Sequence, residues 1–223
     1  MSYRNDIIQQ TPEWWKFKTG KVSGTRFGQL ISTRENSLLF EMANEILDGA
    51  PEQTDFENED MLFGIEQEKH AIDALEAYTG LTFLRGGVLV SDRYPDMHMA
   101  SPDGITADGR VVAEVKSTMH GKMQIKRFIQ GVDSSMMGQI INYFAVEDKV
   151  EKVIWASWCP FRRERPLVVY EFTRNSVIES KETKKDGLIE TTIQDKVDLS
   201  HTLLAQLGVD LKNVIEQFTT IKF

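Results

Sequence analysis

The amino-acid sequence predicts an α/β domain in which a central mixed β-sheet is flanked by helices. Three observations predict this class: helical segments open the chain, a run of short strand-like segments follows, and a helix, two further strands and a last helix complete it. The length of 223 residues fits one domain. Hydrophobic residues make up 41% of the chain and charged residues 27%, which is ordinary for a globular protein.

The N-terminal sixty residues are expected to be helical. Thr11 can cap a helix that begins at Pro12, because a hydroxyl suits the N-cap and proline suits the first helical position. Two more short helices are expected over residues 26–31 and 38–47. Residues 50–60, rich in Pro, Asp, Asn and Glu, are expected to form a surface loop.

The middle of the chain predicts a long helix and then strands. The helix spans residues 61–79, and Gly80 marks its end, because glycine readily adopts the left-handed conformation after a last turn. Three strand-like segments follow, over residues 81–90, 97–101 and 110–117. The turn signals Pro102-Asp103-Gly104 and Ala107-Asp108-Gly109 separate the second of these strands from the third.

The rest of the chain predicts a helix over 132–146, strands over 152–159 and 167–172, and a final helix over 195–218. We therefore expect one domain, residues 1–223. It would consist of a helical N-terminal segment (1–60), a core that holds the sheet (61–173) and a C-terminal helical extension (174–223).

Composition narrows the possible functions. No apolar run approaches the roughly 20 residues that cross a bilayer, and the first residues lack the apolar stretch of a signal peptide, so a cytoplasmic protein without membrane contact is expected. Cys159 is the only cysteine, which excludes an internal disulfide and a cluster held by four cysteines. The formal net charge of −8 counts against nucleic acid as a partner, unless a basic groove is local.

Asp103, Glu114 and Lys116 form a pattern that suits phosphodiester hydrolysis. Side chains alternate along a strand, so Glu114 and Lys116 point to one face, and a tight turn would bring Asp103 beside Glu114. Two carboxylates can hold Mg²⁺ or Mn²⁺, which activates a water near neutral pH, and a lysine beside that water can orient it. The alternative is a hairpin with a solvated Glu/Lys face.

Two helices each place a polar residue on their apolar stripe. In the helix from Met61, the stripe runs through Met61, Ile65, Glu68, Ile72 and Leu75. A buried carboxylate at Glu68 needs a metal ion or a basic partner, and a salt bridge within the core is the alternative. In the helix from Val132, Gln139 occupies the matching position, where it would serve either in an active site or as a core glutamine bonded to backbone.

These residues resemble the lambda exonuclease-like (YqaJ-type) phage recombination nucleases of the PD-(D/E)xK superfamily. Four blocks carry the resemblance, in order and at similar spacing: Gly64 to Glu68, Ser101-Pro102-Asp103-Gly104, Glu114-Val115-Lys116, and Gln139. The resemblance covers roughly residues 12–160 and implies a restriction-endonuclease-like core. The chain would then be a metal-dependent deoxyribonuclease that needs Mg²⁺, with two ions expected and Mn²⁺ as a substitute.

The resemblance also assigns roles within this cluster. Asp103, Glu114 and the main-chain carbonyl of Val115 would be metal ligands, and Glu68 would assist at the second ion. Lys116 would activate the water, and Gln139 would help to position it.

The segment from Trp14 to Thr25 resembles the family's pocket for a 5′-phosphate. Lys18 and Thr25 stand where the family has Arg and Ser, and a lysine cannot make the bidentate contact of an arginine. Arg26 could supply that guanidinium, and Ser23 and Ser101 would also face the pocket. The alternative is that the lysines of this segment only keep the surface soluble.

Two further features have more than one interpretation. Met61 stands near the family's apolar wedge, which separates the end base pair, but its place as the first residue of the apolar stripe favours packing in the core. Arg162, Arg163 and Arg165 could contact a DNA backbone or serve solubility alone. His70 and His120 match no catalytic position of the family.

The resemblance implies a 5′→3′ exonuclease that degrades one strand of double-stranded DNA from its end. The product would be 3′ single-stranded DNA, which a single-strand annealing protein uses for recombination. A homotrimeric ring is implied, with a basic channel that would reconcile DNA binding with the net charge. The alternatives are an endonuclease of the same fold, of the restriction or repair type, and an inactive DNA-binding module.

Overall fold

The computed structural model describes residues 3–32, 37–51, 58–183 and 187–220. Its centre is a five-stranded mixed sheet in the order β2-β5-β6-β7-β8. The strands are β2 (Leu84–Arg85), β5 (Gly104–Ile105), β6 (Val111–Ser117), β7 (Lys152–Trp158) and β8 (Leu167–Phe172). Only β6 and β7 run parallel in this sheet; the other pairs are antiparallel. The predicted α/β class with a central mixed sheet is confirmed.

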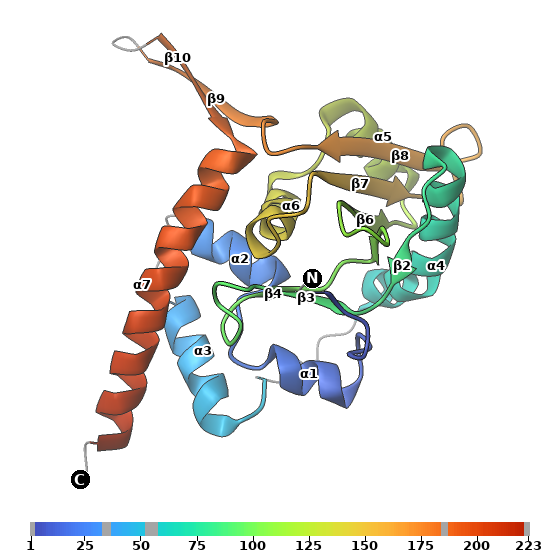
Figure 1. The fold of residues 1–223 in the computed structure, drawn as a ribbon. Helices are drawn as coiled ribbons and strands as arrows, with labels where there is room; N and C mark the ends of the chain where they lie inside the picture. Colours follow the sequence, from blue (N-terminus) through green and yellow to red (C-terminus); the bar gives the residue numbers. More distant parts are fainter. Residues whose placement is uncertain (1–2, 33–36, 52–57, 184–186, 221–223) are drawn as a thin grey trace.

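Two smaller sheets flank the centre (Figure 1). The first has the order β1-β3-β4 and consists of β1 (Tyr3–Arg4), β3 (Val88–Val90) and β4 (Met99–Ala100). Val22 forms a parallel bridge with His98, so the N-terminal segment is tied to the strand that leads to Asp103. The second is the hairpin of β9 (Val177–Thr183) and β10 (Gly187–Thr192), which projects from the body of the molecule.

Helices cover both faces of the central sheet. On one face lies α4 (Glu59–Thr79), whose Ala71, Ile72 and Leu75 pack against Ala113 and Val115 of β6. On the other lie α5 (Gly121–Gln130) and α6 (Ser134–Val146). The remaining helices are α1 (Pro12–Lys18), α2 (Gly24–Ile31), α3 (Ser37–Asp48) and α7 (Ile193–Thr220). The larger core cluster joins α2, α3, α6 and α7.

The N-terminal helices begin as local chemistry dictates. Thr11 caps α1 by accepting a hydrogen bond from the Trp14 amide at 3.3 Å, as predicted. The second helix begins at Gly24, two residues before the predicted start. Asn58 caps α4, and Gly80 ends it with φ +72°, as predicted. Most of the predicted loop over 50–60 falls on residues 52–57, which lie outside the described residues.

Several predictions about the strands were wrong. The single strand over 81–90 is two strands in different sheets, because Gly86 and Gly87 both adopt positive φ and turn the chain between them. The turn at 102–104 is also a strand start, since Gly104 pairs with Ala113. Four further elements had no predicted counterpart: β1, α5, β9 and β10.

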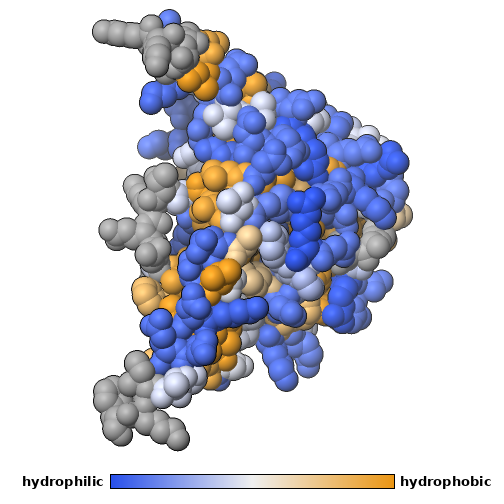
Figure 2. All heavy atoms as spheres, turned by 60° about the vertical axis from the view of Figure 1, so that its left-hand side comes forward, coloured by the Kyte–Doolittle hydropathy of each residue, from blue (hydrophilic) through white to orange (hydrophobic). Residues whose placement is uncertain are grey.

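The long α7 lies along one side of the molecule, and the face that it helps to form is mostly hydrophilic with scattered hydrophobic side chains (Figure 2). Among those exposed on this helix are Leu199, Val209 and Phe218. None of the helices in the described ranges is both long and apolar enough to span a membrane.

Candidate active site

The β5–β6 hairpin brings the two predicted carboxylates together. Gly104 pairs with Ala113 across the antiparallel ladder, so the preceding Asp103 stands beside Glu114. Asp103 Oδ2 accepts a hydrogen bond from the Val115 amide at 2.7 Å, which fixes the carboxylate against β6. The predicted tight approach of Asp103 to Glu114 is confirmed.

Glu114 is fully buried and both of its carboxylate oxygens have partners. Lys116 Nζ donates to Oε1, as expected for two side chains on the same face of a strand, and the Tyr143 hydroxyl donates to Oε2. Gln139 Nε2 donates to the Tyr143 hydroxyl at 3.4 Å, so the glutamine acts on Glu114 through the tyrosine. Tyr143 lies one helical turn after Gln139 in α6, and its contact with Glu114 cannot be read from sequence spacing.

The electrostatics of the cluster follow from crowding of like charges. Burial and the neighbouring Glu114 raise the pKa of Asp103 well above its usual range. Burial also disfavours the ammonium of Lys116, but Glu114 and Asp103 outweigh it and raise the pKa of Lys116 to about 12. Burial and Glu114 raise the pKa of Glu68 in the same way. The site therefore concentrates negative charge around one lysine.

Glu68 lies at the margin of the cluster. The predicted stripe of α4 is buried only in its C-terminal half, where Ile72 and Leu75 are nearly inaccessible. Met61 and Ile65 are 51% and 47% exposed, so the prediction that they pack in the core was wrong. Glu68 stands at the transition between the two halves and is partly exposed, with its carboxylate facing the cluster rather than a hydrophobic core.

A polar network supports the strand behind Lys116. Arg127 of α5 donates to the Lys116 carbonyl at 3.2 Å and to Ser157 Oγ at 2.9 Å. Ser157 Oγ in turn donates to Gln124 Oε1 at 2.6 Å. All three side chains are buried, and burial lowers the pKa of Arg127. No sequence signal pointed to this network, because it depends on a helix that was not predicted.

The N-terminal segment reaches the site through Ser101. Trp14 Nε1 donates to Ser101 Oγ at 3.0 Å, two residues before Asp103. Lys18 Nζ lies 4.8 Å from the centre of the Trp14 ring and 5.2 Å from that of Trp15. Burial lowers the pKa of Lys18, and the nearby Arg26 lowers it further. Two cations thus converge in the segment that sequence analysis associated with a phosphate.

Arg26 is engaged within the protein. Its guanidinium forms a bidentate ion pair with Glu45 of α3, at 2.6 and 2.8 Å. Ser23 is the N-cap residue of α2 and makes no side-chain capping bond to that helix, while Thr25 in the first turn is exposed. Amides at such a helix start favour an anion, because the helix dipole is positive there.

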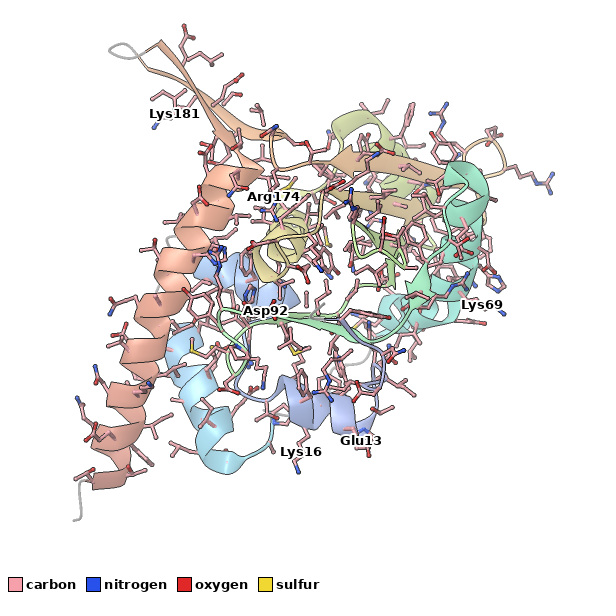
Figure 3. All side chains as sticks on the ribbon, in the orientation of Figure 1. Glu13, Lys16, Lys69, Asp92, Arg174 and Lys181 are labelled. Atoms are coloured by element: carbon pink, nitrogen blue, oxygen red, sulfur yellow. The ribbon has the colours of Figure 1, made fainter. Side chains whose placement is uncertain are left out.

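A groove with a volume of about 380 Å³ borders the cluster. Its lining includes Glu68 and Lys69 of α4, Arg85 of β2, and Gln9 of the N-terminal segment. Gln9 Nε2 donates to the carbonyl of Pro102 at 2.9 Å, which ties this part of the wall to the turn that bears Asp103. Gln10, also in the wall, has φ +64°, a strained conformation for a residue with a side chain. Lys69 projects from α4 beside this groove, whereas Lys16 projects from α1 away from the molecule (Figure 3).

The other predicted residues lie at the periphery. Met61 is exposed at the start of α4, and His120 Nε2 lies 3.6 Å from Asp60 beside it. His70 is exposed on α4. Arg162, Arg163 and Arg165 lie in the loop between β7 and β8.

The chemistry of the donors fits a hard divalent cation. Asp103 and Glu114 offer carboxylate oxygens side by side, and their mutual repulsion marks a place where a cation is favoured. Within the described ranges, no three acidic, histidine or cysteine side chains converge into a ready-made metal cluster. A main-chain carbonyl would have to complete the ligand set.

The fold, the acidic cluster on its hairpin and a family match together identify a deoxyribonuclease. A family model described as a YqaJ-like viral recombinase domain matches residues 13–150, which is more than half of the chain. The chain belongs to this family. Among curated proteins, none matches the sequence significantly.

Solved structures share the fold over nearly the whole chain. An alkaline exonuclease from Laribacter hongkongensis, LHK-Exo, has a TM-score of 0.73 at 20% identity, covering 94% of this chain and 96% of its own. Its complex with dAMP gives 0.72 at 19% identity, with 93% and 96% covered. A phage-related exonuclease from Haemophilus somnus 129PT gives 0.60 at 12% identity, with 89% and 96% covered. At these identities the likeness establishes the fold.

Proposed function

We propose that the chain is a Mg²⁺-dependent 5′→3′ exonuclease that degrades one strand of double-stranded DNA from its end. One observation carries the proposal: the hydrogen bond from Trp14 to Ser101 joins the cationic segment around Lys18 to the turn that bears Asp103. A 5′-phosphate bound by the segment around Lys18 would lie close to the proposed hydrolytic cluster at Asp103. The exonuclease descriptions of the structures with this fold agree with the proposal.

The acidic residues would hold the metal ions. Asp103, Glu114 and the Val115 carbonyl are the proposed ligands, with Glu68 assisting at the second of two ions, and Mn²⁺ is expected to substitute for Mg²⁺. Bound there, a divalent ion stabilises charge on the phosphate and makes its water nucleophilic near neutral pH.

The chain's own residues orient the reaction. Lys116 donates a hydrogen bond to Glu114 on the face that carries the two carboxylates, so its Nζ would orient and activate the attacking water. The Tyr143 hydroxyl holds Glu114 in one orientation, and Gln139 holds Tyr143. Gln139 is thus proposed to position the site through its neighbour.

The 5′-phosphate would be bound by Lys18 and by the start of α2. Lys18 supplies the charge, and Ser23, Thr25 and Ser101 supply hydroxyls. Arg26 would contribute positive electrostatic potential and would not make a bidentate contact with the phosphate, because its guanidinium already pairs with Glu45. Met61, exposed at the start of α4, is proposed as the wedge that opens the end base pair.

Assembly follows from the same proposal. A homotrimeric ring would surround the duplex, and a basic inner surface would reconcile DNA binding with the net charge of −8. The enzyme would hand its 3′ single strand to a single-strand annealing protein in the cytoplasm of the host cell. A gel-filtration mass equal to that of a monomer at working concentration would refute the ring.

The first test compares wild type with Lys116→Ala on linear duplexes that bear a 5′-phosphate or a 5′-hydroxyl. Wild type should degrade the phosphorylated strand with Mg²⁺ and not with chelator. The variant should lose about 10² to 10⁴-fold in rate, because it lacks the group that orients the water. Lys16→Ala, which removes an outward-pointing lysine, should digest like wild type.

Three outcomes would contradict parts of the proposal. Equal digestion of both 5′ ends would remove the phosphate pocket at Lys18. Nicking of a closed circular plasmid would favour an endonuclease, since an exonuclease needs an end. No digestion by either wild type or Lys116→Ala would remove the catalytic assignment and favour a DNA-binding module.

A further inference from the structure

The loop over residues 159–166 lies at the catalytic end of the central sheet. Because β6 and β7 are parallel, their carboxyl ends share one edge, and Ser117 next to Lys116 pairs with Trp158. The loop leaves the sheet one residue later and closes on itself through a hydrogen bond from the Cys159 amide to the Pro166 carbonyl at 2.8 Å. Figure 1 shows the connection from β7 to β8 beside α4.

An exposed pair of aromatic rings marks this loop. Phe161 is 67% exposed and stacks on Phe63 of α4, with ring centres 6.0 Å apart and an angle of 25° between the planes. Two neighbouring rings with accessible surface offer a place on which another flat ring can stack. Here a neighbouring ring fixes Phe161 while much of its surface faces solvent.

The same loop concentrates positive charge in an acidic protein. Arg162, Arg163 and Arg165 lie within four residues of one another, and the described residues offer no carboxylate in an ion pair with any of them. Arg162 packs against Gly121 at the start of α5, where an added Cβ would approach its Nε to 2.4 Å. Arg165 stacks on Phe128 with its guanidinium 3.9 Å from the ring centre.

We propose that Phe161, Phe63 and the three arginines form a platform for single-stranded DNA. Aromatic faces stack on bases and arginines meet phosphates, which together bind unpaired strands with little sequence preference. The interior of a duplex cannot use the platform in this way, because its base faces are already stacked on one another. The platform extends the proposed nuclease function: it binds the strand that becomes unpaired beside the cluster.

The test measures the affinity of the full-length protein for a labelled oligothymidylate, with chelator present so that no cleavage occurs. Phe161→Ala should weaken binding by about fivefold to a hundredfold, which corresponds to the loss of one stacked base. Phe161→Tyr should restore most of the affinity. Phe218→Ala is the matched control, since that ring is 72% exposed near the end of α7, on the opposite side of the molecule (Figure 1).

The contribution of the arginines is tested by the salt dependence of binding. Arg163→Ala should reduce the slope of log affinity against log salt concentration by about 0.7, the value for one phosphate contact on a single strand. The midpoint of thermal unfolding should not change in Phe161→Ala or in Arg163→Ala, because both side chains are exposed.

Two results would overturn the platform: unchanged oligothymidylate affinity in Phe161→Ala, or an equal loss for a blunt duplex and a single strand. The result for the platform can be distinguished from the result for the proposed nuclease activity. If Phe161→Ala loses affinity while Lys116→Ala still digests DNA, the platform stands and the catalytic assignment falls. If Lys116→Ala is inactive and Phe161→Ala binds normally, the reverse holds.

Discussion

The carboxylate of Glu114 is the most enclosed charge of the site. A buried ion is costly unless it is paired and hydrogen-bonded, and Lys116 and Tyr143 meet both needs. The hydroxyl of Tyr143 therefore contributes to stability as well as to geometry, since it comes from another helix and keeps the Glu114 side chain in one position.

Replacing that hydroxyl should be measurable. Tyr143→Phe keeps the ring but leaves one oxygen of Glu114 without its donor, so the free energy of unfolding should fall by about 1–3 kcal/mol. Urea denaturation followed by fluorescence measures it. Tyr78→Phe is the control, because Tyr78 is 71% exposed on α4 and its change should stay within about 0.5 kcal/mol. Equal midpoints for the two variants would show that the contact carries no stability.

At the scale of elements, two helices approach each other through a pair of glycines. An added Cβ at Gly138 of α6 would lie 2.5 Å from the Cα of Gly28 in α2. This contact matters for the site, because α6 carries Gln139 and Tyr143 whereas α2 begins in the proposed phosphate pocket. The close crossing sets how far apart the two parts of the site lie.

Two alanine substitutions should therefore have opposite effects. Gly138→Ala should lower the free energy of unfolding by about 1–3 kcal/mol, because backbone atoms of α2 cannot move aside as a flexible side chain does. Gly64→Ala meets nothing within 4 Å in the interior of α4 and should raise it by about 0.5–1 kcal/mol, since alanine favours helix. Thermal and urea unfolding measure both. A stabilised Gly138→Ala variant would refute the tight crossing.

The element that sequence analysis missed most completely is α5, and its burial explains the failure. This helix turns Gln124 and Arg127 inward to the network behind Lys116 and leaves Ile125, Phe128 and Ile129 exposed. An apolar stripe is normally interpreted as the buried face, so the pattern of this helix indicates the wrong side for packing on the sheet. The β9–β10 hairpin was not predicted for a related reason. It projects from the body of the molecule, so few of its side chains are buried and the alternation of apolar and polar residues along its strands is weak.

On the scale of the whole molecule, His98 lies where three layers meet. Its Nε2 lies 2.6 Å from Asn142 Oδ1 of α6, and its ring stacks on Phe27 of α2 at 5.5 Å. His201 of α7 is the nearby titratable group that opposes its charge. Burial, partly offset by the Asn142 hydrogen bond, lowers the pKa of His98 to about 4, and its buried Nδ1 has no partner among the described residues.

Stability should consequently depend on pH through His98. Between pH 6.5 and about 4 the unfolded chain binds a proton at this imidazole and the folded chain does not. The contribution of the neutral imidazole to the free energy of unfolding is fully present above pH 6.5. It is lost as the pH falls toward 4, and the loss is on the order of 3 kcal/mol. Urea unfolding of wild type and His98→Gln across this range isolates it, because the carboxylates titrate in both. An imidazole that titrates near 6.5 by NMR in the folded protein would contradict the prediction.

Much of the site could be predicted because strand periodicity and short spacing are local properties. Alternation along β6 placed Glu114 and Lys116 on one face, and the turn that precedes β5 brought Asp103 to them. Helix caps at Thr11 and Gly80 were likewise correct, since each depends on a few neighbouring residues. The same local reasoning failed at Met61, because a helical stripe does not reveal how far along a helix the core extends.

By itself, the sequence determined the α/β class, most helices and the Asp103, Glu114 and Lys116 cluster, because these follow from periods of 2 and 3.6 residues and from spacing along one hairpin. Only the tertiary structure decided that Tyr143 meets Glu114, that Arg127 supports Lys116 and that Arg26 pairs with Glu45. Those contacts join residues from separate elements. Their existence depends on how helices pack across the sheet, which no local pattern encodes.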